Sequence, residues 1–307
     1  MSARYVKFRS MTTLETKAPS TNWRRDLIVD GRRLALLDTG EHDRTCVLVH
    51  GLAASWDYWR LTIPALTASH RVVAVDLPGF GYSEDRGRYG PDELVKVLIE
   101  LVNQERIDTV DLIGHSMGTV VVSEFAARYP DRVDRLVLTG GPIISVLDLP
   151  NHPYQTLRRQ PQVATFIVEA LTAGIKLPPQ LQNLIVRRGW ARWAAFRAYM
   201  PHPERIDDDV FAGVLRGVGA RAVLPTLYGG WWWRYDLRNA LVNVTCPTLV
   251  IAGERDTISP VGDVEEFARI ARTNVTVEHL HDTGHAPMLE KPEAFNKLLA
   301  QFLAERR

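Results

Sequence analysis

The chain of 307 residues has only two cysteines, almost no net charge and no long apolar run. Cys46 and Cys246 flank segments that we predict to be non-adjacent strands, so we expect buried thiols and no disulfide. A net charge of +1 gives no general attraction to nucleic acid or to an anionic membrane. No uncharged stretch approaches the length of a membrane span, and the first 25 residues lack the apolar core of a signal peptide. We therefore expect a cytoplasmic protein with a small-molecule substrate, no nucleic-acid partner and no membrane span; its oligomeric state stays open.

Short apolar runs and helical segments alternate along most of the chain. Residues 1–25 carry six basic residues against one acid and are predicted to be a flexible tail. Two strands joined by Asp30-Gly31 follow as a hairpin. Five further runs, rich in valine, leucine and isoleucine and without alternation, are typical of buried parallel strands; they are TCVLVHG, RVVAVDLPG, TVDLIGHS, VDRLVLTGG and PTLVIAGERD. A final strand is expected at VTVEHL. Helices are expected near 56–69, 91–105, 117–129, 261–272 and 292–305.

This alternation predicts an α/β fold, a mostly parallel eight-stranded sheet with helices on both faces. It is interrupted once, between residues 142 and 244, where no buried-strand run occurs. We expect several short helices there, broken at Pro150, Pro161, Pro178-Pro179, Pro201 and Pro225. The predicted organisation is a core of residues 26–141 and 245–307 with a helical cap of residues 142–244.

Ser116 lies in GHSMG, where a predicted strand ends and a predicted helix begins. Flanking glycines at 114 and 118 allow a sharp turn that would aim the hydroxyl into a cleft, which is the geometry of a nucleophile elbow. The alternative is a serine that only caps the helix.

A serine nucleophile needs a histidine to accept its proton and a carboxylate to orient that histidine. Asp256 follows one predicted strand, in GERDTISP, and His285 follows the last strand, in HDTGHAPMLEKP. We predict a Ser116–Asp256–His285 triad at three strand ends, with Asp148 and Asp282 as rival carboxylates. His279 and His281 share a strand face, but no third ligand accompanies them, so we expect no metal and no cofactor.

Two backbone N–H groups are candidates for an oxyanion hole, those of Met117 at the helix start and Leu52 in the loop after the first parallel strand. His50 would brace that loop by hydrogen bonding. Trp56 could line the pocket floor or pack a helix.

The ordered segments HGLAASWDYW, VVAVDLPGFGYSED, GHSMG, GERDTISP and DTGHAPMLEKPEAF resemble the α/β-hydrolase superfamily. The resemblance covers residues 27–141 and 245–305 and points to cap-bearing esterases, perhydrolase-like enzymes and carbon–carbon bond hydrolases. It implies the α/β-hydrolase fold and a serine–acid–histidine triad. Epoxide hydrolases and haloalkane dehalogenases of this superfamily use an aspartate nucleophile, so Ser116 argues against both activities.

The segment GWARWAAFRAYM, read as a helix, puts Trp190, Trp193, Phe196 and Met200 on one stripe together with Arg197. Arg197 could snorkel to water, pair with an acid or bind a substrate anion. Carbon–carbon bond hydrolases of the superfamily use a pocket arginine and tryptophan, which keeps that reaction open here.

The predicted cap holds twelve Lys or Arg against seven Asp or Glu. This excess could favour an anionic substrate or belong to a solvated outer face. Trp231 shares a face with Tyr235 and could contact a bulky ligand or pack in the core.

From these features we expect a cofactor-independent serine hydrolase that forms an acyl-enzyme. The expected substrate is an ester, thioester or lactone of medium size, aromatic or anionic. One alternative is cleavage of a carbon–carbon bond next to a ketone, and another is a ligand-binding receptor on a hydrolase scaffold.

Overall fold

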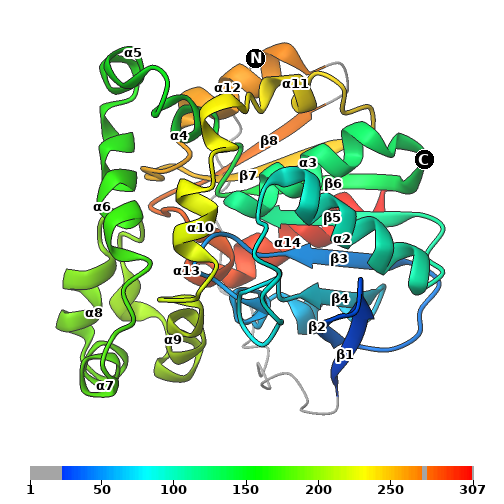
Figure 1. The fold of residues 1–307 in the computed structure, drawn as a ribbon, viewed down its shortest axis with the longest axis horizontal. Helices are drawn as coiled ribbons and strands as arrows, with labels where there is room; N and C mark the ends of the chain where they lie inside the picture. Colours follow the sequence, from blue (N-terminus) through cyan, green and yellow to red (C-terminus); the bar gives the residue numbers. More distant parts are fainter. Residues whose placement is uncertain (1–22, 272–274, 306–307) are drawn as a thin grey trace.

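The computed structural model describes residues 23–271 and 275–305, which form one eight-stranded sheet with helices on both faces and a helical layer beside it (Figure 1). The strands are β1 (Arg24–Val29), β2 (Arg32–Asp38), β3 (Thr45–Val49), β4 (Arg71–Val75), β5 (Val110–His115), β6 (Val133–Thr139), β7 (Thr248–Gly253) and β8 (Val275–Leu280). Their spatial order is β1-β2-β4-β3-β5-β6-β7-β8. The sheet has the mostly parallel, eight-stranded form that the sequence predicts.

The first two strands form the predicted hairpin, with Asp30 and Gly31 both at positive φ. Strand β2 is antiparallel to β4, and the remaining pairs are parallel. The predicted tail boundary was two residues too late, because Arg24 and Arg25 belong to β1. Arg25 forms ion pairs with Asp38 and Glu105, which fixes this end of the strand to the fold.

Each face of the sheet is covered by helices. On one face lie α2 (Pro91–Gln104), α3 (Met117–Arg128), α11 (Arg238–Leu241) and α12 (Val261–Ile270). On the other lie α1 (Ile63–Leu66) and α14 (Pro292–Ala304). The single helix expected over 56–69 is instead a 3-10 turn (Trp56–Trp59) followed by α1, because Pro64 cannot sit inside a continuous helix.

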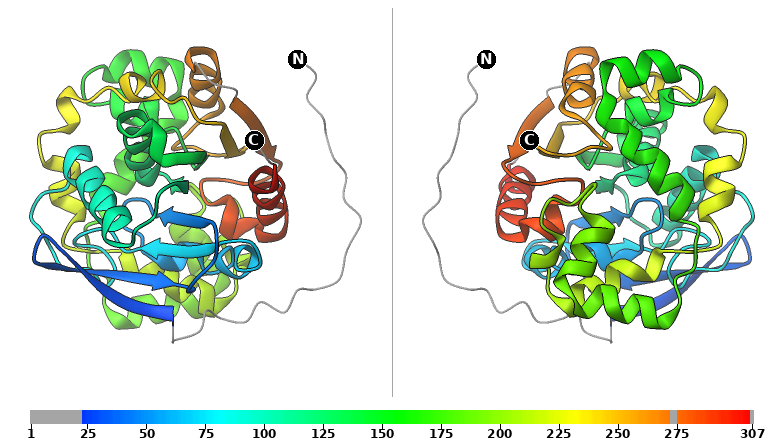
Figure 2. Two further views of the ribbon diagram at one scale, coloured as in Figure 1. Left: turned by 90° about the vertical axis from the view of Figure 1, so that its right-hand side faces the viewer. Right: turned by 90° about the vertical axis from the view of Figure 1, so that its left-hand side faces the viewer.

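Between β6 and β7 the described chain is helical and contains no strand. Its helices before α11 are α4 (Ile144–Asp148), α5 (Pro153–Arg159), α6 (Ala164–Thr172), α7 (Pro179–Arg187), α8 (Gly189–Phe196), α9 (Asp208–Val214) and α10 (Val223–Tyr228). Figure 1 shows α5 to α8 together on one side of the molecule, and they face the viewer in the right panel of Figure 2.

The prediction that Pro225 breaks a helix was wrong, since α10 runs through it. Pro225 is the third residue of α10, where its missing N–H has no intrahelical acceptor.

Both cysteines are buried free thiols, Cys46 on β3 and Cys246 just before β7. Among the helices of the described residues, none is long and apolar enough to cross a membrane.

Candidate active site

Ser116 occupies the turn between β5 and α3 with φ 54° and ψ −120°, a strained backbone for a residue other than glycine. Close packing imposes this turn. A Cβ at Gly118 would lie 2.3 Å from the Val49 carbonyl oxygen, and one at Gly114 would lie 2.6 Å from the Gly118 carbonyl oxygen. Both glycines are therefore required for α3 to approach the sheet, and the strained turn matches the predicted elbow.

Asp256 and His285 come together at the carboxyl ends of β7 and β8. The His285 Nδ1 lies 3.0 Å from Asp256 Oδ1 and 2.9 Å from Oδ2, and both residues are buried. Asp256 Oδ1 also accepts the N–H groups of Ile258 and Ser259, at 2.8 and 2.9 Å. These bonds hold the carboxylate against His285 Nδ1, and an imidazole that carries its proton on Nδ1 can act as a base through Nε2.

The backbone of His285 is held by two further hydrogen bonds. Its N–H donates to the Tyr199 carbonyl oxygen, 2.7 Å away, and its carbonyl oxygen accepts from His115 Nε2 at 2.9 Å. His115 directly precedes Ser116, so this bond ties the histidine loop to the elbow. Burial and the charge of His285 lower the pKa of His115 well below its ordinary value, which suits a neutral positioning residue rather than a base.

The side chains of Ser116 and His285 are not hydrogen-bonded to each other in this structure. Ser116 stays 9% exposed, and its hydroxyl bonds to no side chain among the described residues. Catalytic hydrogen bonds are often long in the absence of substrate and tighten when substrate binds. The geometry therefore supplies an oriented histidine and a buried hydroxyl without a side-chain partner among the described residues.

Leu52 and Met117 each present a backbone N–H beside the elbow. Gly51 approaches so closely that a Cβ there would lie 2.7 Å from Ser116 Cβ, which puts the Leu52 loop next to the serine. Neither the Leu52 nor the Met117 N–H donates to any acceptor among the described residues. Two free N–H groups next to a nucleophile can stabilise an oxyanion.

Electrostatics keeps the triad histidine basic. Burial lowers the pKa of His285, but the Asp256 carboxylate, followed by Glu169 and Glu290, outweighs that effect and raises the pKa above its ordinary value. Glu290, at the end of α13 (Pro287–Glu290), accepts the N–H groups of Gly284 and Ala286 on either side of His285. Burial raises the pKa of Glu290 to about 7.

Glu169 was not found by sequence reasoning. It is half-buried on α6, one turn from Thr165, whose hydroxyl lies 2.9 Å from that of Thr257 beside Asp256. The face of α6 that carries Glu169 therefore looks toward the triad. Burial, with opposing effects of His285 and Asp256, raises the pKa of Glu169. No residue spacing signals this carboxyl, because the packing of α6 alone brings it there.

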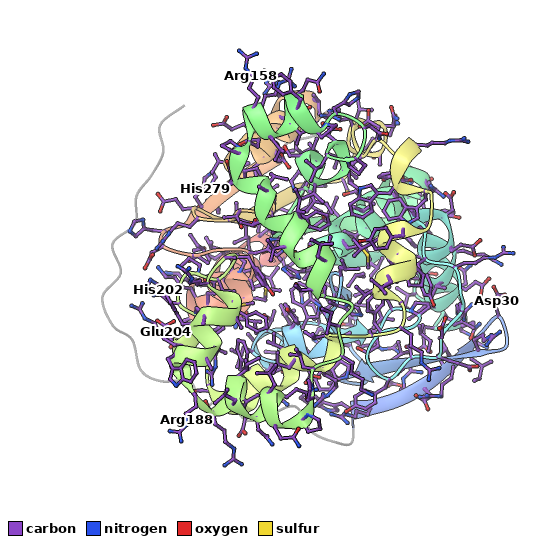
Figure 3. All side chains as sticks on the ribbon, turned by 60° about the vertical axis from the view of Figure 1, so that its left-hand side comes forward. Asp30, Arg158, Arg188, His202, Glu204 and His279 are labelled. Atoms are coloured by element: carbon purple, nitrogen blue, oxygen red, sulfur yellow. The ribbon has the colours of Figure 1, made fainter. Side chains whose placement is uncertain are left out.

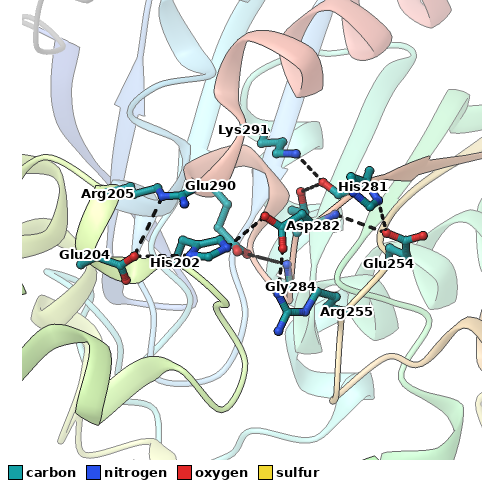
Figure 4. Close-up of polar contacts among 11 residues, drawn as sticks. His202, Glu204, Arg205, Glu254, Arg255, His281, Asp282, Gly284, Glu290 and Lys291 are labelled. Carbon is teal, nitrogen blue, oxygen red and sulfur yellow. Dashed lines mark hydrogen bonds and ion pairs between the residues drawn. The ribbon is translucent and has the colours of Figure 1, made fainter. Parts of the chain in front are cut away.

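The rival carboxylates have other partners. Asp148 pairs with Arg238, while Asp282 bonds to Arg255 and His202 in a polar cluster at the histidine loop (Figure 4). In the same cluster His281 Nδ1 lies 2.6 Å from Glu254 Oε2. Figure 3 shows His279 at the periphery of the molecule.

The predicted apolar stripe is confirmed for Phe196 and Met200, which are buried, but was wrong for Trp190 and Trp193. Trp190 and Trp193 are 67% and 44% exposed, and Arg197 is exposed with its guanidinium 4.5 Å from the Trp193 ring centre. The buried arginine is Arg192, which bonds to backbone carbonyls and to Asp208. Helix α8 is therefore rotated about its axis from the expected orientation. This orientation buries the Arg192 guanidinium, whose N–H groups find enough hydrogen-bond acceptors there.

Three other predicted contact residues have structural partners. His50 is fully buried and braces its loop as predicted, since Nε2 accepts the Leu77 N–H and Nδ1 lies 2.7 Å from the Gly51 carbonyl. Trp56 is buried in the core under the Arg24 guanidinium.

Trp231 stacks edge-on with Tyr235, as their shared face predicts, and its Nε1 donates to the Thr226 carbonyl. It lines a surface groove with Tyr228 and Leu224 rather than the walls around Ser116. The contacts of Trp231 lie in this groove, whereas the place of Trp56 at the pocket floor stays a prediction.

Comparison with known proteins agrees with this fold. The family described as "Alpha/beta hydrolase family" matches residues 46–298. The chain is 30% identical to the 2-hydroxymuconate semialdehyde hydrolase of Pseudomonas sp. (strain CF600), covering 92% of this chain and 94% of that protein. It is 27% identical to the 2-hydroxy-6-oxononadienedioate/2-hydroxy-6-oxononatrienedioate hydrolase of Cupriavidus pinatubonensis, covering 88% and 90%. The crystal structure of a meta-cleavage product hydrolase from Pseudomonas fluorescens IP01 is similar in fold, with 21% identity, a TM-score of 0.65 and coverage of 91% and 97%.

Proposed function

Because the chain belongs to the alpha/beta hydrolase family, we propose that it is a hydrolase with Ser116 as nucleophile, His285 as general base and Asp256 as the orienting carboxylate. The observation that carries the assignment is the hydrogen-bonded Asp256–His285 pair beside a strained serine elbow. Residues 142–244 would serve as the cap over this site, as the bond from Tyr199 to the histidine loop suggests.

The proposed reaction begins when Ser116 Oγ attacks a substrate carbonyl carbon and His285 Nε2 takes the hydroxyl proton. The Leu52 and Met117 N–H groups would hold the oxyanion. The bond to the leaving group then breaks, and His285 returns the proton to that group. Water, deprotonated by the same histidine, releases the acyl group and restores Ser116.

The first candidate reaction is cleavage of the carbon–carbon bond next to the ketone of a 2-hydroxy-6-oxo dienoate. The sequence analysis ranked ester hydrolysis first and carbon–carbon bond cleavage as an alternative, and this order is now reversed. Its support is the pair of relatives named as 2-hydroxymuconate semialdehyde and 2-hydroxy-6-oxononadienedioate hydrolases, both matched over most of their length.

The second candidate is hydrolysis of an uncharged ester, thioester or lactone. A specific observation favours it: Glu169 faces the triad, whereas Arg197, the arginine considered for a substrate anion, is exposed. A carboxylate beside the site disfavours an anionic acyl group by like-charge repulsion.

One assay separates the candidates. Purified protein is given a 2-hydroxy-6-oxo-dienoate meta-cleavage product and, separately, p-nitrophenyl esters from acetate to decanoate. The control is Ser123→Ala, a buried serine on α3 away from the elbow. We expect Ser116→Ala to lower turnover of the true substrate at least about a thousandfold and Ser123→Ala to leave it within about tenfold.

Preference for the dienoate supports the first candidate, and preference for esters supports the second. Turnover that survives in Ser116→Ala would overturn the proposed nucleophile. Tight ligand binding with no Ser116-dependent turnover of any substrate would instead favour the receptor alternative.

A further inference from the structure

The exposed apolar side chains of this protein are concentrated on the helices between β6 and β7. Of the thirteen large hydrophobic residues exposed in the described part of the chain, all but Ile28 and Tyr82 lie between residues 142 and 244, which leaves eleven. Exposed apolar residues are normally scattered, so this concentration on one layer marks an interaction surface.

Helix α6 presents the centre of that surface. Ile167, Val168 and Leu171 lie on the face opposite the buried Phe166 and Ala173, and Leu171 is 65% exposed. Ile175 follows the helix and is also exposed. Leu224 of α10 adjoins them, because a Cβ at Gly174 would lie 2.6 Å from its Cδ2. We call Ile167, Val168, Leu171, Ile175 and Leu224 the outer cap patch.

The neighbouring helices extend the apolar character. Leu181 and Leu184 on α7 and Trp190 and Trp193 on α8 are exposed as well. Figures 1 and 2 show α7 and α8 on the same side of the molecule as α6. Exposed tryptophans are typical of side chains that settle at the boundary between lipid headgroups and acyl chains.

Unpaired positive charge surrounds the outer cap patch. From Pro142 to Met200 the chain holds seven basic residues and two acids, Asp148 and Glu169. Asp148 pairs with Arg238, and Glu169 faces the triad. Arg192 is buried, but the other basic residues are exposed and have no ion-pair partner within the described residues; they are Arg158, Arg159, Lys176, Arg187, Arg188 and Arg197. Figure 3 places Arg158 and Arg188 at opposite ends of this layer.

We propose that the outer cap patch docks on an anionic lipid surface, with Ile167, Val168 and Leu171 entering the interface and the surrounding cations contacting lipid headgroups. Each cation near an anionic surface adds to the attraction, and apolar side chains add the burial of their surface. The net charge of +1 for the whole chain does not reveal this local excess of basic residues around the outer cap patch.

A second copy of the chain fits the same surface less well. A symmetric dimer through the outer cap patch would bring two sets of six unpaired cations together, and the exposed acids of this layer without an ion-pair partner, Asp207 and Asp209, are too few to neutralise them. A lipid surface with anionic headgroups covers the apolar residues and neutralises the cations at once.

The test is co-sedimentation of the full chain with vesicles of phosphatidylcholine alone and of phosphatidylcholine with phosphatidylglycerol. We expect binding to the anionic vesicles that weakens as salt is raised. The double substitution Val168→Ser with Leu171→Ser should weaken binding at least about tenfold, which corresponds to about 1.4 kcal/mol. Ile28→Ser, an equally exposed isoleucine on β1, is the matched control and should bind like the wild type.

A charge variant supplies a second, independent readout. Arg187→Glu with Arg188→Glu should weaken binding to anionic vesicles and flatten its salt dependence, whereas Arg106→Glu, exposed in the loop between α2 and β5, should not. Absence of vesicle binding, equal binding to neutral vesicles, or unchanged binding by the Val168/Leu171 variant would overturn the proposal. So would a dimer in sedimentation velocity that the same variant dissociates.

Discussion

The protonation of His285 depends on carboxylates from three separate parts of the chain. Asp256 comes from the loop after β7, Glu169 from α6 and Glu290 from α13. Only Asp256 bonds to the imidazole, but all three negative charges favour its protonated form. The activity of a histidine base is lost as it becomes protonated, so these carboxylates also set the acid limit of catalysis.

At the residue scale we therefore predict that Glu169→Gln moves the acid limb of the kcat/KM profile to lower pH. Removal of that negative charge lowers the pKa of His285, so the neutral base persists in more acidic solution. The measurement is kcat/KM against pH for the substrate found in the assay above. Glu265→Gln, an exposed glutamate on α12, is the control and should leave the profile in place. An unmoved acid limb in Glu169→Gln would show that its carboxylate does not act on His285.

At the scale of elements, the elbow depends on the contact between α3 and β3. The Gly118 Cα faces the Val49 carbonyl with no space for a methyl group. The helix also carries few polar groups, and ten of its twelve residues are buried, so it cannot slide outward without exposing apolar surface.

We predict that Gly118→Ala lowers the free energy of unfolding by about 3 kcal/mol, because overpacking must displace α3 or β3. The control is Gly31→Ala in the β1–β2 turn, where nothing lies within 4 Å and only the positive φ is unfavourable. That change should cost about 1 kcal/mol. Urea unfolding of both variants measures the difference, and equal losses would contradict the close approach.

On the scale of the whole molecule, three carboxyl groups, of which Asp76 and Asp263 are buried and Glu290 is half-buried, hold separate segments together. Asp76 accepts the N–H groups of Trp56 and Tyr82, and Asp263 accepts from Ser145 at the base of the helical layer. Glu290 holds the histidine loop. Burial raises the pKa of each to about 7.

For Glu290 the sign of the pH effect follows from linkage. Its pKa rises from an ordinary 4.5 to about 7 on folding, so the folded protein binds more protons in that window and loses stability as pH rises through it. Glu290→Gln is uncharged throughout. We predict that raising the pH from about 5 to about 8 destabilises the wild type relative to this variant by up to about 3 kcal/mol. Urea unfolding at both pH values measures this, and parallel changes in the two proteins would contradict it.

The sequence by itself determined the sheet and the positions of Ser116, Asp256 and His285. Their signals are local: apolar runs without alternation, a serine between glycines after a strand, and polar residues at the ends of later strands. Parallel strands bring their carboxyl ends to one edge, so local patterns were enough to place these residues together. The hairpin at Asp30-Gly31 was predictable for the same reason.

Only the tertiary structure decided the orientation of the helices between β6 and β7. The pattern of α8 suggested that Trp190 and Trp193 face inward, yet Arg192 is buried because carbonyl groups from other segments satisfy its guanidinium. The same holds for α6, whose Glu169 faces the triad while its leucine and isoleucine side chains face outward. Predicting helix orientation from amphipathic periodicity assumes that apolar residues are buried. The prediction fails where residues distant in sequence stabilise a buried charge, and where another surface covers the apolar face of the helix.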